Sequence, residues 1–401
     1  MQFTDTPEEA AFRTEVREFI KSEYNKDSGL DADARGATQV ASSGGAAAMA
    51  SYNAWMKKLA TKGWVAPAWP KEYGGADMSV MQQFIFNEEL ALARAPRPGG
   101  IGITMAGPTI IAYGTEEQKR EHLTPMLSGD SIWCQGFSEP ESGSDLASLK
   151  TKAVRDGDDY VVNGQKIWTT GAQYSDRMIL MARTDQDAPK HKGISYFLMD
   201  MKSPGVEVRP LVNMAGTPGF NEVFMENVRI PVKDLLGEEN RGWYVGTTTL
   251  DYERSSIGTS IAQGQMVEDL LDEVRSQKSE GRSISDASRA ELADRFIESV
   301  TARLMSYNVI SMQNRGLVPN HEASAVKIYA GELNQRIQNT ALKVLGLSGQ
   351  LLRSESNGKW TPAKGKYARA YLGAVASTIA GGTSEINRGI IATRGLGLPR
   401  G

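Results

Sequence analysis

The sequence predicts a mainly α-helical protein with a central β domain. Apolar residues repeat at three- and four-residue intervals up to about residue 125, and this pattern returns from residue 242 to residue 401. From about residue 131 to 241, short runs rich in β-branched and aromatic residues are separated by Asp, Asn, Gly and Pro. A chain of 401 residues also exceeds the usual size of one hydrophobic core. We therefore expect an N-terminal helical domain (1–125), a central β domain (126–241) and a C-terminal helical bundle (242–401).

The N-terminal domain is predicted to begin with a capped helix. The stretch "TPEEAAFRTEVREFI" places Thr6 and Pro7 where an N-cap and a first helical residue are favoured. Two breaks follow. The small-residue stretch "ASSGGAAAMAS" (41–51) is interpreted as a loop or a helix entry. In "APAWPKEYGGADMS" (66–79), Pro and Gly exclude a continuous helix.

The central domain contains the runs "DDYVVNGQKIWTTG", "RMILMART", "GISYFLMDM" and "GVEVRPL". In the first run, Asn163-Gly164 stands between apolar residues, which is the strongest short signal for a β-hairpin. We therefore predict that the two flanks of this dipeptide pair with each other. Beyond residue 242, "GQMVEDLLDEVRSQ" and "RAELADRFIESVTARLMSYNVISMQNR" predict long helices.

Composition excludes several classes of function. The formal net charge of −3 provides no basic surface for nucleic acid or an anionic membrane. One cysteine, Cys134, and three scattered histidines exclude an intrachain disulfide and argue against a zinc cluster. Neither a signal peptide nor a membrane-spanning apolar stretch is recognisable, so we expect a cytoplasmic protein. A bacterial protein is the simplest case, and a matrix protein stripped of its transit peptide is the alternative.

The segment "WCQGFSEPESGSDLASL" (133–149), followed by "IWTTGA" (167–172), carries the main functional signal. Ser138, Ser142, Gly143 and Ser144 offer hydroxyl groups and close backbone approach, which suit a planar heterocycle or a phosphate. An ordinary polar loop is the alternative interpretation. The core "SEPESGSD", however, closely resembles the first signature of the acyl-CoA dehydrogenases.

The resemblance covers almost the whole chain. "GWVAPAWPKEYGGADMS", "YGTEEQKREHLTPMLSGD" and "RGLGLPR" are similar to other segments of the same family, in the same order. It implies an N-terminal helical domain, a β-barrel-like middle domain and a C-terminal four-helix bundle that drives tetramer formation. It also implies FAD as cofactor, an acyl-CoA thioester as substrate and an electron-transferring flavoprotein as electron acceptor. Members remove the α-proton, pass the β-hydrogen as hydride to flavin N5, and release a trans-2-enoyl-CoA.

The resemblance also assigns flavin and CoA contacts. Gln135, Phe137 and Ser138 match residues on one side of the flavin ring, and Trp168, Thr169 and Thr170 match residues on the other. Ser138 and Thr170 are expected to hydrogen-bond the ring, and Trp168 to pack on it. Gly143 and Ser144 are assigned to the cofactor site, and Ser144 also to the pantetheine or phosphate end of CoA. For Trp168, a buried strand aromatic is the alternative.

A base is needed because an α-proton beside a thioester is far less acidic than a carboxylic acid. One branch of the family carries its glutamate in a C-terminal Glu-Gly-Thr, but here that triplet is Gly381 to Thr383, within "IAGGTSEINR". Another branch carries it in a Glu-Arg motif, matched by "LDYERSSIG" (250–258). The resemblance therefore implies Glu253 as the base, with a surface Glu-Arg pair as its alternative and Glu385 as a second candidate base.

The same alignment assigns the remaining site residues. Asp251 and Arg254 match CoA contacts. Gly381 keeps a backbone N–H for the thioester oxygen, and Thr383 and Glu385 match FAD contacts.

The cross-subunit part of the FAD site departs from the family pattern. Arg282 is the nearest candidate for a pyrophosphate-binding arginine in "EVRSQKSEGRSISD", and "LKVLGLSGQ" carries Lys343 and Gly346 where Gln and a Gly-rich turn are common. Lys343 could equally be a solvated helix residue. This modified pattern resembles bacterial members that act on bulky thioesters and sometimes combine two different subunits. Three hypotheses follow: a homotetrameric dehydrogenase, a subunit of a hetero-oligomer, or a flavin-dependent oxidase or monooxygenase on the same fold.

Overall fold

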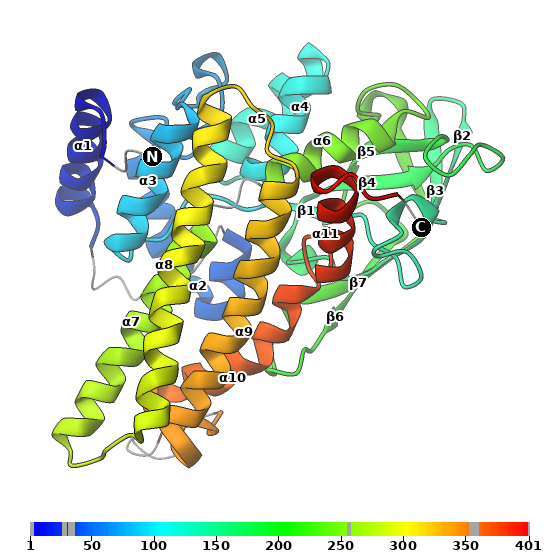
Figure 1. Ribbon diagram of the computed structural model, residues 1–401. Coiled ribbons are helices and arrows are strands. Elements are labelled where there is room, and N and C mark those ends of the chain that lie inside the picture. The colour runs from blue at the N-terminus through cyan, green and yellow to red at the C-terminus, as the bar shows by residue number, and fades with distance from the viewer. Residues whose placement is uncertain (1–3, 26–29, 31–36, 255–257, 353–360, 400–401) are drawn as a thin grey trace. The chain divides into compact units, whose positions relative to one another are not determined.

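A computed structural model describes the backbone of residues 4–25, 30, 37–254, 258–352 and 361–399. Within these ranges, the side chains of residues 37–39, 41–46, 251–254, 258 and 259 are not described. The chain divides into two compact units. The first contains Met1–Ser79, Ala93–Asn213 and Thr217–Glu253, and the second contains Val80–Leu92, Met214–Gly216 and Arg254–Gly401. Figure 1 colours both by residue number.

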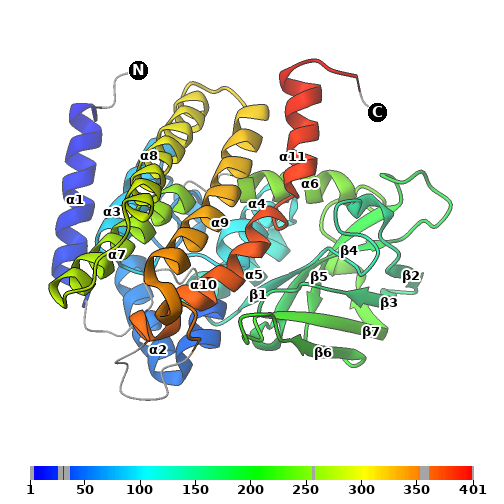
Figure 2. The same cartoon turned by 60° about the horizontal axis from the view of Figure 1, so that its bottom comes forward.

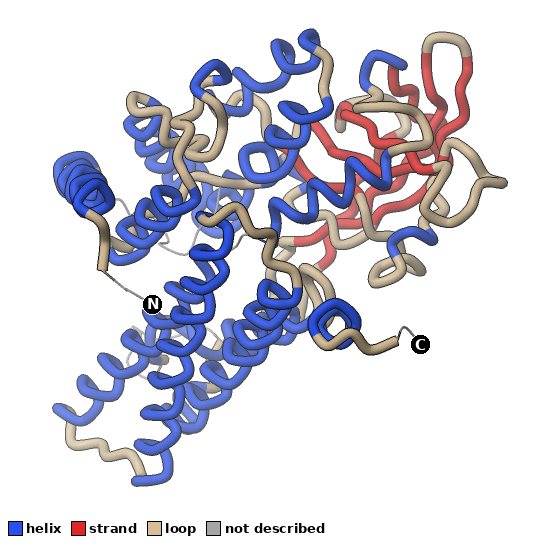
Figure 3. The backbone as a smooth tube through the Cα atoms, turned by 45° about the horizontal axis from the view of Figure 1, so that its top comes forward, coloured by secondary structure: helices blue, strands red, loops and turns tan. Residues whose placement is uncertain are grey.

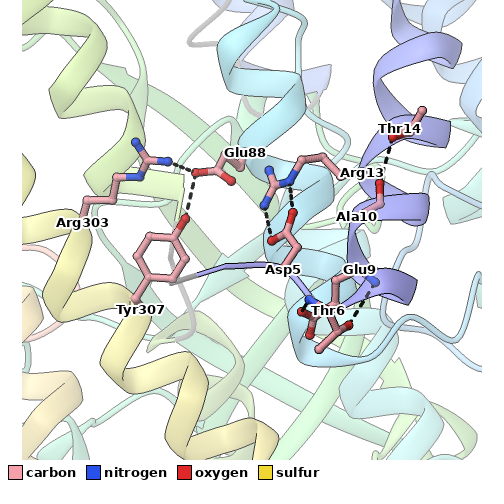
Figure 4. Close-up of polar contacts among 9 residues, drawn as sticks. All are labelled: Asp5, Thr6, Glu9, Ala10, Arg13, Thr14, Glu88, Arg303 and Tyr307. Carbon is pink, nitrogen blue, oxygen red and sulfur yellow. Dashed lines mark hydrogen bonds and ion pairs between the residues drawn. The ribbon is translucent and has the colours of Figure 1, made fainter. Parts of the chain in front are cut away.

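The first helix of the first unit, α1 (Pro7–Glu23), confirms the predicted start at Thr6 and Pro7. Thr6 Oγ1 accepts a hydrogen bond from Glu9 N at 3.2 Å, and Glu9 Oε2 accepts one from Thr6 N at 2.8 Å. This reciprocal capping box satisfies two backbone donors that the helix start leaves without intrahelical partners. Arg13 adds a two-bond contact to Asp5 (2.6 and 3.0 Å), which ties the preceding residues to the helix (Figure 4).

The predicted break at residues 41–51 is wrong, because α2 runs without interruption from Ala37 to Ala60. Alanine has the highest helix propensity, so a stretch rich in alanine and serine can remain helical despite two glycines. The later turns are held by burial of Tyr52, Trp55 and Leu59. The break predicted for residues 66–79 is confirmed, since only a short 3-10 helix, Lys71–Tyr73, forms there.

Two further helices of this unit precede its strands: α4 (Gly107–Tyr113) and α5 (Glu116–Ser128). A single π-helical segment, Gly102–Ala106, leads into α4. Trp69 fixes this segment, because its Nε1 donates to Ile103 O at 2.9 Å.

The β domain of the first unit is one curled seven-stranded sheet, shown red in Figure 3. Its order is β1-β4-β2-β3-β7-β6, and β5 pairs with β4. The strands are β1 (Trp133–Gly136), β2 (Lys152–Asp156), β3 (Asp159–Lys166), β4 (Arg177–Arg183), β5 (Ile194–Asp200), β6 (Val206–Leu211) and β7 (Phe220–Pro231). Alternate residues of these strands fill a buried core that includes Tyr160, Phe197 and Met199.

The predicted hairpin at Asn163-Gly164 is wrong, because β3 passes straight through the dipeptide. Asn163 instead bonds to a bulge in β7: its Oδ1 accepts from Asn227 N at 2.9 Å, and its Nδ2 donates to Asn227 Oδ1 at 3.2 Å. A Cβ at Gly164 would lie 2.5 Å from Thr151 Oγ1, so glycine here serves close packing. The hairpin turn lies earlier, at Gly157 (φ 64°), where β2 and β3 pair.

The second unit is helical and includes α7 (Gly258–Ser279), α8 (Asp286–Asn314) and α9 (His321–Gly349), which pack on one another. The two long helices predicted beyond residue 242 are thereby confirmed. Helix α3 (Val80–Leu92) packs on α7 and α8, while α10 (Lys366–Ala374) and α11 (Ser384–Ile390) pack on α9. Figure 2 shows α7 to α10 as a bundle.

A buried carboxylate joins α3 to α8 within this unit. Glu88 is 2% exposed, and its Oε1 accepts hydrogen bonds from the Arg303 guanidinium and from Tyr307 OH, the latter at 3.2 Å. Figure 4 shows the three side chains facing one another. The ion pair and the hydrogen bonds offset the free energy lost when the carboxylate is removed from water.

Candidate functional site

Strand β1 and the loop that follows it carry the first group of predicted site residues. Gln135 lies opposite Ile179 of β4 in a parallel pair, and its side-chain Nε2 is buried without a hydrogen-bond partner in the described part of the chain. Phe137 is buried and meets Tyr196 edge to face, with ring centroids 5.8 Å apart. Ser138, the next residue, is half-buried. The first segment predicted to flank the flavin therefore starts on a fixed strand.

The loop from Glu139 to Leu149 begins with a tight turn. Glu139 N donates to Ser142 O at 3.1 Å, and Ser142 N donates to Glu139 O at 3.0 Å. Gly143 and Ser144 follow this turn and are exposed. No heavy atom lies within 4 Å of the position that a Gly143 Cβ would take, so protein packing does not require glycine there. The bare backbone of Gly143 is therefore open to close approach by a ligand.

A buried ion pair between Lys166 and Glu139 holds the start of this loop. Lys166, at the end of β3, is 0% exposed, and its Nζ lies 2.8 Å from Glu139 Oε1. Burial alone raises the pKa of Glu139, but the Lys166 charge and the hydrogen bonds from Lys166, Thr151 and Lys150 outweigh it, so the pKa is lowered. Burial lowers the pKa of Lys166 to about 8, partly opposed by Glu139. Both groups therefore remain charged at neutral pH.

The second group of predicted residues follows β3 directly. Trp168 adopts a left-handed backbone conformation (φ 60°) and leaves 60% of its side chain exposed. A bulky residue at positive φ is strained and persists only where its surroundings enforce it. Enforcement comes from both sides: Ile167 N donates to Ser138 O at 2.9 Å, and Thr169 N donates to Asn221 O at 3.0 Å. The alternative interpretation of Trp168, a buried strand aromatic, is therefore wrong.

Asn221, on β7, completes the hold on this segment. It is fully buried, and its Nδ2 donates to Thr169 O at 2.9 Å and to Gln173 Oε1 at 2.5 Å. Thr169 is also buried, and its hydroxyl has no hydrogen-bond partner among the described residues. Thr170, one residue further, is exposed.

These observations fit a flat, polar-edged ring such as an isoalloxazine. Gln135 Nε2 and Thr169 Oγ1 are buried polar atoms left unsatisfied by the described part of the protein. Buried polar groups are nearly always paired in native proteins, so a bound water or a ligand is expected to complete each of them. Trp168 adds an exposed aromatic face beside them. The structure therefore brings the two predicted groups together and leaves them with unmet hydrogen-bonding capacity.

Helix α6 (Gly242–Arg254) carries the predicted base and CoA contacts. It packs closely on the sheet, because a Cβ at Gly242 would lie 2.4 Å from the Ser195 carbonyl carbon. Thr249 Oγ1 is 2.9 Å from Thr109 Oγ1 and 3.2 Å from Tyr196 OH, and all three residues are buried.

Glu253 lies four residues after Thr249, so it is one helical turn further along. The backbone of Asp251, Glu253 and Arg254 is helical, and their side chains lie outside the described residues.

The C-terminal predicted residues lie in the second unit. Gly381 is exposed with φ 66°, and within the described chain its N–H donates to no carbonyl. Thr383 caps α11 by accepting from Ile386 N at 3.2 Å. Asn387 Nδ2 donates to Gly382 O at 2.9 Å and so fixes the turn. Glu385 is 82% exposed, with Arg388 4.0 Å away.

The remaining predicted FAD contacts, Arg282, Lys343 and Gly346, are also in the second unit. Arg282 is exposed in the turn after α7. Lys343 Nζ is 2.8 Å from Glu291 Oε1 in a half-exposed ion pair, which favours the solvated-helix interpretation of this lysine. Gly346 interrupts α9 with φ 59° and ψ −142°. Such a break frees backbone groups that a regular helix would use internally.

A possible metal-binding group exists away from these residues. Among the described residues, Glu121, His122 and Asp234 have ligand atoms within 4.8 Å of one another. Two cations already contact the carboxylates of this group. Glu121 lies 3.4 Å from Arg177 and 3.1 Å from Lys233, and Asp234 lies 4.0 Å from Arg177. Two cations beside the group oppose the binding of a third.

Sequence reasoning missed Lys166, Asn221 and Thr249. Lys166 had a usable signal, because it falls in the same strand register as the apolar residues Tyr160 and Val162 and so points to the buried face. Its partner, Glu139, stands 27 residues earlier, and no spacing rule joins the two. Asn221 and Thr249 carry no local signal.

Models of the N-terminal, middle and C-terminal domains of acyl-CoA dehydrogenases match residues 6–130, 134–228 and 240–396. The acyl-CoA dehydrogenase FadE26 of Mycobacterium tuberculosis is 38% identical over 359 residues, which cover 87% of this chain and 88% of that protein. Two solved structures cover 100% of both chains at 33% identity. They are the Tcur3481-Tcur3483 steroid ACAD, with a TM-score of 0.84, and the ChsE4-ChsE5 complex of Mycobacterium tuberculosis, with a TM-score of 0.80. In the described residues, every helix is too short or too polar to cross a membrane.

Proposed function

This chain belongs to the acyl-CoA dehydrogenase family, and from that premise we propose that it is an FAD-dependent enzyme that converts an acyl-CoA thioester to its trans-2-enoyl-CoA. One observation carries the proposal: the segments 135–138 and 168–170 lie side by side in one unit, with Gln135 Nε2 and Thr169 Oγ1 buried and unsatisfied. FAD is the group that would meet these donors and acceptors. When bound, it supplies the acceptor for the hydride that leaves the β-carbon.

Glu253 is proposed as the base that takes the α-proton. The argument is its position in the Glu-Arg motif and on α6, whose preceding turn is fixed by buried hydroxyl groups. A carboxylate kept from water beside an acyl chain has a raised pKa, which makes it a stronger base. Asp251 and Arg254, from the same turn, are proposed to contact CoA.

Gly381 is proposed to donate its backbone N–H to the thioester carbonyl oxygen, where negative charge develops as the proton leaves. Support comes from its uncommitted N–H and from the positive φ that glycine tolerates without strain. Ser138 and Thr170 are proposed to hold the flavin ring, and Ser144 the CoA pantetheine. Thr383, Glu385, Arg282 and Gly346 are proposed as peripheral FAD contacts.

The variant Glu253→Gln tests the base. It should retain yellow FAD and bind acyl-CoA, yet reduce its flavin at least about 1000-fold more slowly under anaerobic conditions, because a glutamine cannot accept the proton. Glu385→Gln tests the second candidate base: once it is loaded with FAD, this variant should still reduce its flavin, because the proposed role of Glu385 is in FAD binding and not in proton transfer. Normal reduction by Glu253→Gln, or loss of reduction only in Glu385→Gln, would move the base to Glu385.

Substrate class and assembly are proposed from the relatives. One matching structure is described as the Tcur3481-Tcur3483 steroid ACAD, and another as the ChsE4-ChsE5 complex. We propose a bulky, ring-containing acyl-CoA as substrate and an electron-transferring flavoprotein as acceptor. A panel of straight, branched and ring-containing acyl-CoAs, scored by anaerobic loss of flavin absorbance, tests the first. Rapid peroxide release in air would favour an oxidase instead.

A homotetramer in the cytoplasm is the proposed assembly, and a hetero-oligomer is its alternative. The half-exposed ion pair of Lys343 favours the alternative, because it leaves that lysine committed to Glu291 and not to a cofactor phosphate. Native mass and flavin content of the purified chain decide between them. About one flavin per chain in a tetramer supports the homotetramer, whereas a flavin-poor chain that fills only with a partner supports the hetero-oligomer.

A further inference from the structure

We propose that the buried Lys166–Glu139 pair positions the flavin site by locking together the two chain segments that flank the ring. Both residues are positioning residues, since they act through Phe137, Ser138 and Trp168. The inference deepens the proposed function and rests on it. It assigns a role to the charges of Lys166 and Glu139, which have no part in the proposed catalytic steps.

The first part of the argument is how Lys166 joins the two segments. Its Nζ donates to Phe137 O at 3.1 Å and to Glu139 Oε1 at 2.8 Å. The next peptide adds a third link, because Ile167 N donates to Ser138 O at 2.9 Å. Three hydrogen bonds therefore connect residues 137–139 to residues 166–167, directly before the strained Trp168.

The second part is how Glu139 fixes the loop that follows. Its two carboxylate oxygens accept from Lys150 N at 2.6 Å and Thr151 N at 2.9 Å. These bonds join the beginning of the loop to its end, so Gly143 and Ser144 lie on a closed loop. One carboxylate thus receives donors from both the end of this loop and the strand before Trp168.

The third part is the cost of the arrangement. Lys166 is fully buried and Glu139 is 7% exposed. Two apolar residues of similar size often stabilise a core as well as a buried ion pair does, because desolvation consumes most of the electrostatic gain. Stability alone therefore does not explain these charges. Unlike apolar contacts, their directional hydrogen bonds fix the position of residues 137–139 relative to residues 166–168, the two segments proposed to flank the flavin ring.

The test compares Lys166→Met, Glu139→Gln and the double variant with a matched control, Lys150→Met. The control breaks an ion pair with Glu141 on the same loop, but both of its side chains are more than 70% exposed. We expect about tenfold or greater loss of FAD affinity in each variant of the buried pair, measured by titration of the apoprotein. The flavin absorption bands and midpoint potential should shift as well. Lys150→Met should match the unaltered chain in all three measurements.

The double variant separates positioning from stability, because it leaves no unpaired buried charge. Recovery of the unfolding midpoint without recovery of FAD affinity and potential supports the inference. If affinity and potential recover together with stability, or if folded single variants bind FAD normally, the inference is wrong while the proposed function stands. If the unaltered chain binds no FAD, either alone or together with a partner subunit, both are overturned.

Discussion

Replacing Thr249 with valine tests how α6 is held before the predicted base. Thr249 Oγ1 donates to Val245 O at 3.0 Å and lies 3.2 Å from Tyr196 OH, whose residue is fully buried. Valine keeps the shape of threonine but removes one hydrogen-bond partner of the Tyr196 hydroxyl and the partner of Thr109 Oγ1 at 2.9 Å. Loss of hydrogen bonds to buried hydroxyl groups costs about 1–3 kcal/mol, so we expect the free energy of unfolding to fall by about 2 kcal/mol.

Urea unfolding with FAD held at one saturating concentration measures this loss. In the double variant Tyr196→Phe/Thr249→Val no hydroxyl is orphaned, so it should regain about 1 kcal/mol over Thr249→Val. Thr249→Ser keeps the oxygen and should resemble the unaltered chain. The reasoning fails if Thr249→Val unfolds at the normal urea concentration. It also fails if the double variant loses as much free energy of unfolding as Tyr196→Phe and Thr249→Val lose together when measured separately.

The same variant has a second readout, because Glu253 stands one turn beyond Thr249. A displaced turn should slow anaerobic flavin reduction, since misplacement by about 1 Å can cost about 100-fold in rate. Thr249→Ser should reduce its flavin at the normal rate. Equal rates in the valine and serine variants would show that the hydroxyl group does not position the helix.

The remaining predictions concern acid stability and close packing. Burial lowers the pKa of His122 to about 4, so the folded state binds fewer protons than the unfolded state between about pH 4 and the ordinary value of 6.5, and stability is lost as pH falls through that window. Burial raises the pKa of Asp234 to about 6, so its contribution has the opposite sign between the ordinary value of 3.8 and 6. Urea unfolding at pH 7 and pH 5 measures how far the free energy of unfolding falls on acidification. This fall should be about 1 kcal/mol smaller for His122→Gln than for the unaltered chain, and larger for Asp234→Asn. Identical falls in all three proteins would contradict the assignment of these pKa shifts. A Cβ at Gly107 would lie 1.9 Å from Trp69 Cζ2, so Gly107→Ala should cost about 3 kcal/mol and lower the melting temperature. Gly264→Ala, where nothing lies within 4 Å, should instead leave the melting temperature unchanged or raised, and a fall equal to that of Gly107→Ala would refute the steric explanation.

Local signals in the sequence were enough for the elements whose causes are local. The start of α1 follows from Thr6 and Pro7, because a cap and a first-turn proline act within a few residues. Strand-forming runs and long helices follow from side-chain periodicity. The resemblance to the acyl-CoA dehydrogenases, carried by the motifs at 133–149 and 167–172, implied that Gln135 to Ser138 and Trp168 to Thr170 belong to one site.

Two expectations failed where a distant partner outweighed a local preference. Asn163-Gly164 favours a turn when considered alone, but Asn227 on β7 supplies two hydrogen bonds that keep it in a strand. The stretch 41–51 has no apolar periodicity of its own, and α2 continues through it to Tyr52, Trp55 and Leu59. Pairing across a sheet and burial in a core both depend on residues far away in the chain.

The sequence by itself determined the family, the order of helical and β segments and the candidate catalytic and flavin residues, since these are written in contiguous motifs. Tertiary structure alone decided how the flavin segments are held. Lys166, at the end of β3, meets Glu139, in the loop after β1, across 27 residues although β4 and β2 lie between these two strands in the sheet. Asn221, on β7, reaches Thr169, just after the paired strand β3, across 52 residues. Strand pairing brings together residues without any fixed spacing along the chain, so buried charges and orphaned donors become visible only once the sheet is formed.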